Sequence, residues 1–155
     1  MGVTVMADLD IMENDSKQYI VVKIGNEQYG IDISYIDTIV RMQKITRVPK
    51  AQRHFKGVIN LRGEIVPVMS IRLKMKLADD EFTNASRIII LKLEEKGMLG
   101  VIVDEVKEVV TLSSNEVEKS SGKGSFINGV GKHGEELIFL FIIVAGIVYM
   151  IEQLQ

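Results

Sequence analysis

Residues 18–40 read QYIVVKIGNEQYGIDISYIDTIV, and this stretch carries the pattern that decides the fold. A run rich in β-branched residues, 19–24, meets the polar turn Gly25-Asn26-Glu27 and returns through residues 28–31. Short apolar runs separated by glycine or asparagine are typical of β-hairpins. In residues 33–40 the apolar spacing changes from two towards three, which indicates a helical turn before a further strand.

The same pattern returns at residues 87–110, RIIILKLEEKGMLGVIVDEVKEVV. Each copy is followed by another pair of apolar runs, at 57–71 (GVINLRGEIVPVMSI) and at 126–142 (FINGVGKHGEELIFLFI). An internal repeat of this kind predicts two similar structural units. Aligning Gly30 with Gly100 places Ile31, Ile33, Ile36, Ile39 and Val40 on Val101, Val103, Val106, Val109 and Val110.

About five short strands per copy suffice for a small closed barrel, an architecture that leaves no strand edge exposed. We therefore expect an all-β fold with short helices, in which two five-stranded barrels, residues 18–80 and 87–140, pack together. Residues 1–17 are expected to form a flexible tail, and a C-terminal helix, 145–155, to pack across one barrel. Residues 71–77 alternate like a strand but also have good helical propensity, so both structures remain open.

Between the two apolar runs of 57–71 lies a polar tip, residues 60–63, with one long cation at its end. Gly63 can adopt the positive φ that a tight turn requires. Arg62 presents five donors in a fixed arrangement, which suits a carboxylate or helix carbonyls of a partner. Gly57 and Gly63 would let a partner backbone come close. The alternative is a solvated hairpin turn without a binding role.

The composition narrows the class of protein. Hydrophobic residues make up 46% and charged residues 26% of the chain, as in globular proteins, and the net charge is only −2. The absence of cysteine excludes disulfides and thiolate chemistry and fits a reducing cytosol. The run 137–151 is uncharged but shorter than a membrane-spanning helix, which needs about 20 residues. We interpret it as a buried strand that leads into the terminal helix.

Reactive side chains are sparse. His54 lies in a basic loop and His133 in the turn of the last apolar pair, and neither is near a candidate nucleophile. A turn histidine on a charged surface is usually solvated. No cluster has metal-ligand spacing, and Gly122-Lys123-Gly124-Ser125 lacks the pattern of a phosphate-binding loop. The sequence therefore predicts no catalytic activity, no cofactor and no metal.

Charge is distributed unevenly along the chain. Residues 41–76 contain ten lysines or arginines and a single acid, Glu64, whereas the second copy of the repeat is richer in acids. A basic half of a small barrel could bind nucleic acid, but only Phe55 is present there for base stacking. A charge-complementary protein partner and a merely solvated face are the other interpretations.

Several phrases of the sequence, in order, resemble the CheW family of chemotaxis coupling proteins: QYIVVKIGNEQYGIDI, ITRVPKA, FKGVINLRGEIVPV, GVIVDEV and INGVGK. The likeness extends from about residue 18 to residue 140. It implies two five-stranded β-barrels and a non-enzymatic adaptor that works in the cytoplasm. Such an adaptor couples the tips of methyl-accepting chemoreceptors to the regulatory domain of the histidine kinase CheA. It is recruited to receptor arrays without inserting into the membrane, and it binds no nucleic acid.

The resemblance also implies a binding surface, with residues 60–63 and neighbouring strands facing the receptor and the kinase and a groove between the barrels. Ile36 and Leu61 could supply apolar contact there, although each could equally be an ordinary core residue. The family usually has an acid where Thr38 and Ser70 stand, so a pairing of Arg62 with position 38 is lost or replaced. The implied partner-binding residues are Ile36, Thr38, Gly57, Asn60, Leu61, Arg62, Gly63, Val101 and Val103.

Overall fold

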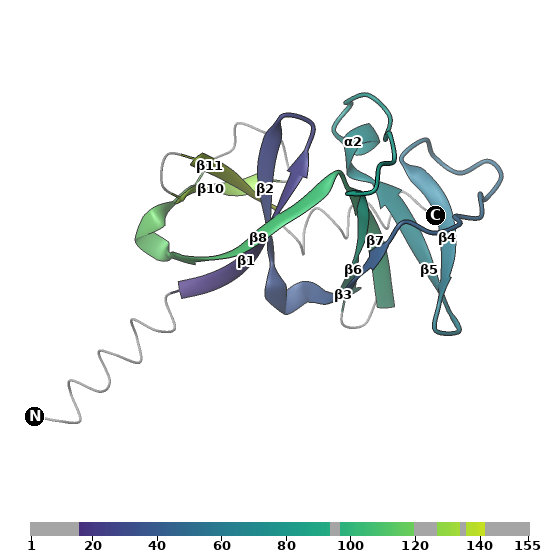
Figure 1. Cartoon of the computed structure of the whole chain (residues 1–155), viewed down its shortest axis with the longest axis horizontal. Coiled ribbons are helices and arrows are strands. Elements are labelled where there is room, and N and C mark those ends of the chain that lie inside the picture. The colour runs from purple at the N-terminus through teal and green to yellow at the C-terminus, as the bar shows by residue number, and fades with distance from the viewer. Residues whose placement is uncertain (1–15, 94–96, 120–126, 134–135, 142–155) are drawn as a thin grey trace, which may run out of the picture.

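The computed structural model describes residues 16–93, 97–119, 127–133 and 136–141, and strands account for most of them (Figure 1). The helical elements are short: η1 (Ile33–Tyr35), α2 (Ile71–Lys74) and η3 (Ser114–Glu116). The strands are β1 (Ser16–Ile24), β2 (Glu27–Asp32), β3 (Ile36–Arg41), β4 (Phe55–Leu61), β5 (Glu64–Ser70), β6 (Arg87–Leu93), β7 (Gly97–Val103), β8 (Glu105–Ser113), β9 (Val117–Lys119), β10 (Ile127–His133) and β11 (Glu136–Phe141).

The strands form two curled sheets that occupy the left and right halves of Figure 1. The first sheet has six strands in the order β8-β1-β2-β11-β10-β9, and the second has five in the order β3-β6-β7-β5-β4. The prediction of an all-β fold with short helices is confirmed. The first sheet exceeds the predicted five strands because the three-residue strand β9 is added beside β10.

The two sheets do not follow the two copies of the repeat, so the predicted boundaries, 18–80 and 87–140, do not delimit them. The hairpin β1-β2 lies in the six-stranded sheet, whereas β3 crosses to the five-stranded sheet and pairs with β6. The second copy does the reverse, because β6-β7 stays in the five-stranded sheet and β8 crosses back to pair with β1. The two copies therefore have the same order of elements along the chain, but strands of one copy pair with strands of the other.

Parallel pairing completes the exchange between the copies. β11 lies parallel to β2, and β5 lies parallel to β7, so the second strand of each late hairpin joins an early hairpin of the other copy. Backbone N–H and C=O groups can form hydrogen bonds with any neighbouring strand, whatever side chains that strand carries. The strand pattern alone therefore could not assign each strand to its sheet.

The core has three parts, one between the sheets and one inside each sheet. Strand β6 shows how this arises, because Ile89 and Leu91 face the core shared by both sheets while Ile88 and Ile90 face the interior of the five-stranded sheet. Burying each such side chain contributes about 1.5–3 kcal/mol. The buried residues of the shared core are Val22, Ile24, Tyr29, Ile31, Met69, Ile71, Ile89, Leu91, Leu99, Val101, Val103 and Ile127.

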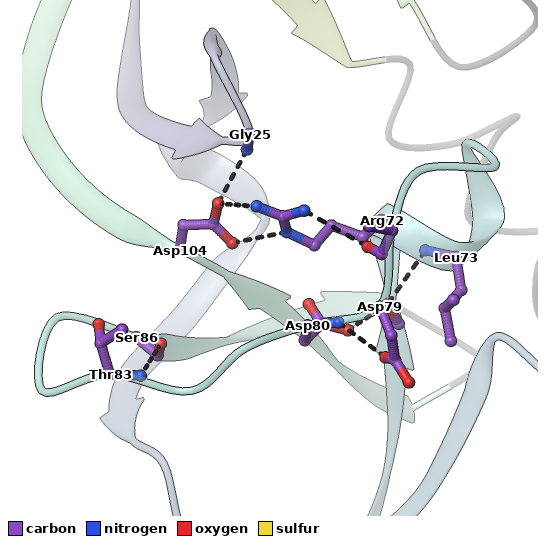
Figure 2. Close-up of polar contacts among 10 residues, drawn as sticks. Gly25, Arg72, Leu73, Asp79, Asp80, Thr83, Ser86 and Asp104 are labelled. Atoms are coloured by element: carbon purple, nitrogen blue, oxygen red, sulfur yellow. Dashed lines mark hydrogen bonds and ion pairs between the residues drawn. The ribbon is translucent and has the colours of Figure 1, made fainter.

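An ion pair joins elements of the two sheets at one edge of the shared core (Figure 2). Arg72 in α2 donates from Nε to Asp104 Oδ1 at 3.0 Å and from Nη2 to Asp104 Oδ2 at 2.6 Å. Asp104 lies between β7 and β8, and its Oδ2 also accepts from the Gly25 N–H at 2.8 Å in the turn between β1 and β2. Burial alone would raise the pKa of Asp104. The bonds from Arg72 and Gly25 outweigh burial and hold the pKa below its ordinary value.

A second polar contact fixes the start of α2 and the loop that follows it. The Ser70 hydroxyl donates to the Asp80 carboxylate and accepts from the Leu73 N–H at 3.1 Å, so it also caps the helix. Burial raises the pKa of Asp80 above its ordinary value, although the bond from Ser70 opposes the shift. The resemblance led us to expect an acid at position 70. The structure has Ser70 there, and Asp80 brings a carboxylate to the Ser70 hydroxyl from the loop.

The structure settles several smaller expectations. Residues 71–74 form a helix rather than a strand, and Ser16 and Lys17 begin β1 rather than ending a tail. The start of the apolar run 137–151 is a strand in which Ile138 is buried but Leu137 is half exposed. The predicted helix at 145–155 and the tail before residue 16 lie outside the described residues. Within the described residues, no helix has both the length and the hydropathy to cross a membrane.

Candidate partner-binding surface

The polar tip between β4 and β5 is a two-residue turn formed by Arg62 and Gly63. Arg62 has φ 52° and Gly63 has φ 86°, the combination of a type I′ turn, whose twist matches that of the flanking strands. The predicted positive φ of Gly63 is thus confirmed. The Asn60 carboxamide oxygen accepts from the Gly63 N–H at 3.0 Å, which holds the turn closed. Asn60, Arg62 and Gly63 are all exposed.

Arg62 forms an ion pair with Asp37, which lies on the opposite edge strand of the same sheet. Its Nη2 lies 3.0 Å from Asp37 Oδ2, and the arginine side chain is 68% exposed. Asp37 falls at a bulge in β3, where the register with β6 shifts between Ile36 and Thr38. Because β3 and β4 are the two edge strands of the five-stranded sheet, this pair lies where the curled sheet brings its edges together. Asp37, the residue before Thr38, therefore supplies the acid that was expected at position 38.

An exposed apolar side chain lies beside this tip and was not predicted from the sequence. Ile65 is 65% exposed and pairs across the hairpin with Asn60. Its neighbours on β5, Val66 and Val68, are buried, so the alternation of the strand directs Ile65 outward. The signal was present in the sequence, because a period of two places Ile65 on the face opposite to Val66. Asp37, Asn60, Arg62, Gly63 and Ile65 together are called the hairpin surface below.

Other predicted contact residues belong to the core instead. Val101 and Val103 are 1% or less exposed and fill the core shared by the two sheets, and Leu61 is buried inside the five-stranded sheet. Their side chains cannot touch a partner in this structure. Ile36 is partly buried and packs against the shared core, which matches its alternative interpretation as a core residue. Thr38 is half-buried in β3.

Gly57 allows a close backbone approach, but within its own chain. It is buried with φ 138°, and a Cβ placed there would lie 2.2 Å from the carbonyl oxygen of Thr46. Thr46 and Val58 exchange two backbone hydrogen bonds, of 2.8 and 2.9 Å, across this contact. The glycine is therefore required for the segment after β3 to lie against β4.

The histidine at position 54 is buried rather than solvated. The residue is only 7% exposed, and its Nε2 has no hydrogen-bond partner among the described residues. Burial lowers the pKa of His54, and the nearby charge of Lys74 lowers it further. The backbone carbonyl of His54 accepts from the Ser70 N–H at 2.8 Å, so the residue ties the loop before β4 to the end of β5.

This burial predicts a pH-dependent stability. A histidine whose folded-state pKa is lowered costs no stability above its ordinary pKa of about 6.5, and destabilises the fold progressively as the pH falls below that value. The free energy of unfolding, measured by urea denaturation at pH 8 and pH 5, should therefore change less for His54→Gln than for the wild type. His133→Gln is the matched control, because His133 is about half exposed. If both variants change with pH as the wild type does, His54 is not the titrating group.

The described residues also limit the chemistry of this surface. Within the described ranges, no group of three or more His, Cys, Asp or Glu side chains could hold a metal ion. The hairpin surface offers one cation, one acid, an amide and an apolar side chain, all on or beside a rigid turn. Such a set can recognise a protein surface through charge and apolar contact.

The chain is similar to several known proteins. Its residues 18–152 match the CheW-like domain. The chemotaxis protein CheW of Bacillus subtilis (strain 168) is 36% identical over 104 residues, which cover 67% of this chain and 66% of that protein. The CheW of Treponema pallidum (strain Nichols) is 30% identical over 139 residues, covering 82% of this chain and 80% of that protein. The crystal structure of the scaffolding protein TtCheW from Thermoanaerobacter tengcongensis has a TM-score of 0.75 at 29% identity, covering 81% of this chain and 88% of that chain.

Proposed function

Because this chain belongs to the CheW family and has a chemotaxis adaptor role, we propose that it couples the cytoplasmic tips of chemoreceptors to the histidine kinase CheA. In this proposal the chain binds both partners at once and has no catalytic activity of its own. It works in the cytoplasm and joins receptor arrays at the membrane through its partners. The regulatory domain of the kinase is the proposed site of its contact.

The observation that carries the proposal is the match to the scaffolding protein TtCheW, which extends over most of both chains. Because 81% of this chain is covered, the match cannot be confined to one of the two sheets. Structural similarity of this extent, together with 29% sequence identity, supports a shared scaffolding function as well as a shared fold. The nucleic-acid alternative has no comparable support.

We assign the hairpin surface to partner contact within this proposal. Arg62 is mostly exposed, and its pairing with Asp37 keeps the guanidinium in a defined position at small cost. Ile65 places an apolar side chain next to it, so a partner helix could bury Ile65 while it offers an acceptor to Arg62. Both residues project from a rigid hairpin, which limits the entropy lost on binding.

The proposal is tested by co-sedimentation of the purified chain with a receptor cytoplasmic fragment and CheA. We expect the chain to enter a ternary assembly, and the amount of kinase recovered with the receptor to rise with the concentration of the chain. Failure of the folded chain to enter the assembly would remove the proposal. Tight, salt-sensitive binding to single-stranded nucleic acid in a parallel assay would favour the alternative.

Substitutions of Arg62 should weaken this assembly with little effect on the fold. Arg62→Asn keeps a residue that tolerates the positive φ of the turn, so the melting temperature should stay close to that of the wild type. Loss of a charged donor at a partly desolvated interface should cost about 2 kcal/mol, or roughly thirtyfold in affinity. Arg62→Glu should weaken the assembly further, because an acid would then face the partner's acceptors.

The control for these variants is Lys107→Asn, an exposed cation on β8 in the other sheet. It should leave the assembly unchanged at physiological salt. Assembly of Arg62→Asn at the wild-type level would mean that the tip is only a solvated turn. A large drop in its melting temperature would mean instead that the arginine is structural.

A further inference from the structure

A second candidate binding site lies at the other end of β4 from the hairpin surface. It is a hollow of about 660 Å³ between the loop that precedes β4, the helix α2 and the loop after α2. Residues 57–61 of β4 separate it from the Arg62 turn, and the strand spans about 20 Å from Lys56 to Arg62 at the usual rise per residue. The two sites can therefore be altered independently. We call this second site the cationic hollow.

Four cations from one loop and the start of β4 line the cationic hollow: Arg47, Lys50, Arg53 and Lys56. Among the described residues that line the hollow, Asp79 is the only acid, and Lys56 Nζ already lies 2.7 Å from its Oδ1. The hydrogen bond from Lys56 lowers the pKa of Asp79, and the charge of Arg53 contributes to the same shift. The lining therefore carries an excess of three positive charges that its own acid does not balance.

The loop that carries these cations is anchored at several points. Thr46 is bound to Val58 by two backbone hydrogen bonds, and the Phe55 N–H donates to the Gln52 carbonyl at 3.0 Å. Buried His54 holds the end of the loop against β5. The cations are thus displayed from a fixed frame, as a recognition site requires.

The hollow also has an apolar part. Phe82 is 52% exposed and Val48 is 43% exposed, and both line it together with Phe55 and Leu73. A large apolar side chain of a ligand would cover these surfaces, while carboxylates on either side of it would meet the arginines. Arg is well suited to that task, because its planar group can bind a carboxylate through two hydrogen bonds.

We propose that the cationic hollow binds an acidic segment of a partner protein, with an aromatic or large aliphatic side chain in the hollow and carboxylates on Arg47 and Arg53. Charge complementarity and the mixed lining favour this occupant over a nucleic acid strand. A strand would bring a row of phosphates past Asp79 and would need stacking surfaces along a groove, whereas the apolar side chains here line a single hollow. The site is separate from the hairpin surface and adds a second contact to the adaptor.

The test uses the full chain and three synthetic twelve-residue peptides. The first has one phenylalanine flanked by glutamates, the second has glutamines in place of the glutamates, and the third has lysines. We expect saturable binding of the glutamate peptide by fluorescence anisotropy, at least tenfold weaker binding of the glutamine peptide, and none of the lysine peptide. In ¹⁵N-labelled protein the glutamate peptide should shift amide signals of residues 47–56 and 79–82 but not those of the Arg62 turn.

Two charge-matched double variants separate this site from general electrostatic attraction. R47E/R53E should weaken the glutamate peptide at least tenfold, whereas K17E/K107E, which changes two exposed cations of the other sheet, should leave it within twofold. Phe82→Ser should weaken the peptide without changing the net charge. The proposal is overturned if the two double variants weaken the peptide equally, if no saturation occurs, or if a single-stranded oligonucleotide binds more tightly than the peptide.

Discussion

Replacement of Gly57 by alanine is expected to lower the free energy of unfolding by about 4 kcal/mol, the combined cost of a strained φ and of overpacking. The added Cβ would lie 2.2 Å from the Thr46 carbonyl oxygen and 2.8 Å from its carbonyl carbon. Both are backbone atoms, so no side-chain rotation can relieve the clash. The segment after β3 would have to leave β4 and lose the two hydrogen bonds between Thr46 and Val58. Urea denaturation followed by circular dichroism measures the loss.

Gly97→Ala is the matched control for this prediction. Gly97 also has a positive φ, 85°, but no atom of the described residues lies within 4 Å of the position of its added Cβ. The substitution should therefore cost only the backbone strain, about 1–2 kcal/mol. Equal losses for Gly57→Ala and Gly97→Ala would show that the contact with Thr46 does not require glycine.

Asp104→Asn is expected to lower the free energy of unfolding by about 2 kcal/mol, because it removes one charge from a partly buried pair. The carboxylate accepts two hydrogen bonds from Arg72 and one from Gly25, and an asparagine amide group would turn a donor towards one of these donors. The side chains of Arg72 and Asp104 are 20% and 25% exposed, which keeps the expected loss below that of a fully buried pair. Chemical denaturation at pH 7 gives the value.

A double-mutant cycle with Arg72→Met isolates the pair, and a coupling energy of about 2 kcal/mol is expected. Asp37→Asn, which breaks the exposed pair with Arg62, should cost less than about 1 kcal/mol. Since the folded-state pKa of Asp104 is lowered, its contribution is present above the ordinary aspartate pKa and is lost as the pH falls below it. The difference between wild type and Asp104→Asn should therefore shrink in acid. A cycle with no coupling would contradict the role of the pair in joining the sheets.

Much of the fold could be predicted from the sequence because hairpins have local signatures. The order of the strands along the chain was predicted correctly from the turns at Gly25 and Gly63 and from the repeat. The assignment of strands to sheets could not be derived, since β3 and β8 have the same kind of apolar residues and either could pair within its own copy. One signal was available in the uninterrupted apolar run of β6, because a strand buried on both faces has no alternation. That run indicated a strand between two cores.

The candidate site was predicted only in its exposed part. Residue types suited to a turn placed Asn60, Arg62 and Gly63 at the surface, and the structure agrees. Val101 and Val103 were predicted as contact residues from the resemblance to the family. A resemblance in sequence identifies matching positions in the chain but does not show whether their side chains are buried, as both are here. The pairing of Arg62 with Asp37 depends on a bulge in β3, which changes the direction of one side chain and has no sequence signature of its own.

Coupling of a receptor to a kinase by this chain can be measured as CheA autophosphorylation in the presence of a receptor cytoplasmic fragment. The rate should be measured with the wild-type chain, with Arg62→Glu, with Lys107→Asn and without the chain. We expect the receptor to change the kinase rate only when the wild-type or Lys107→Asn chain is present. A kinase rate that responds to the receptor equally with and without the folded wild-type chain would contradict this expectation.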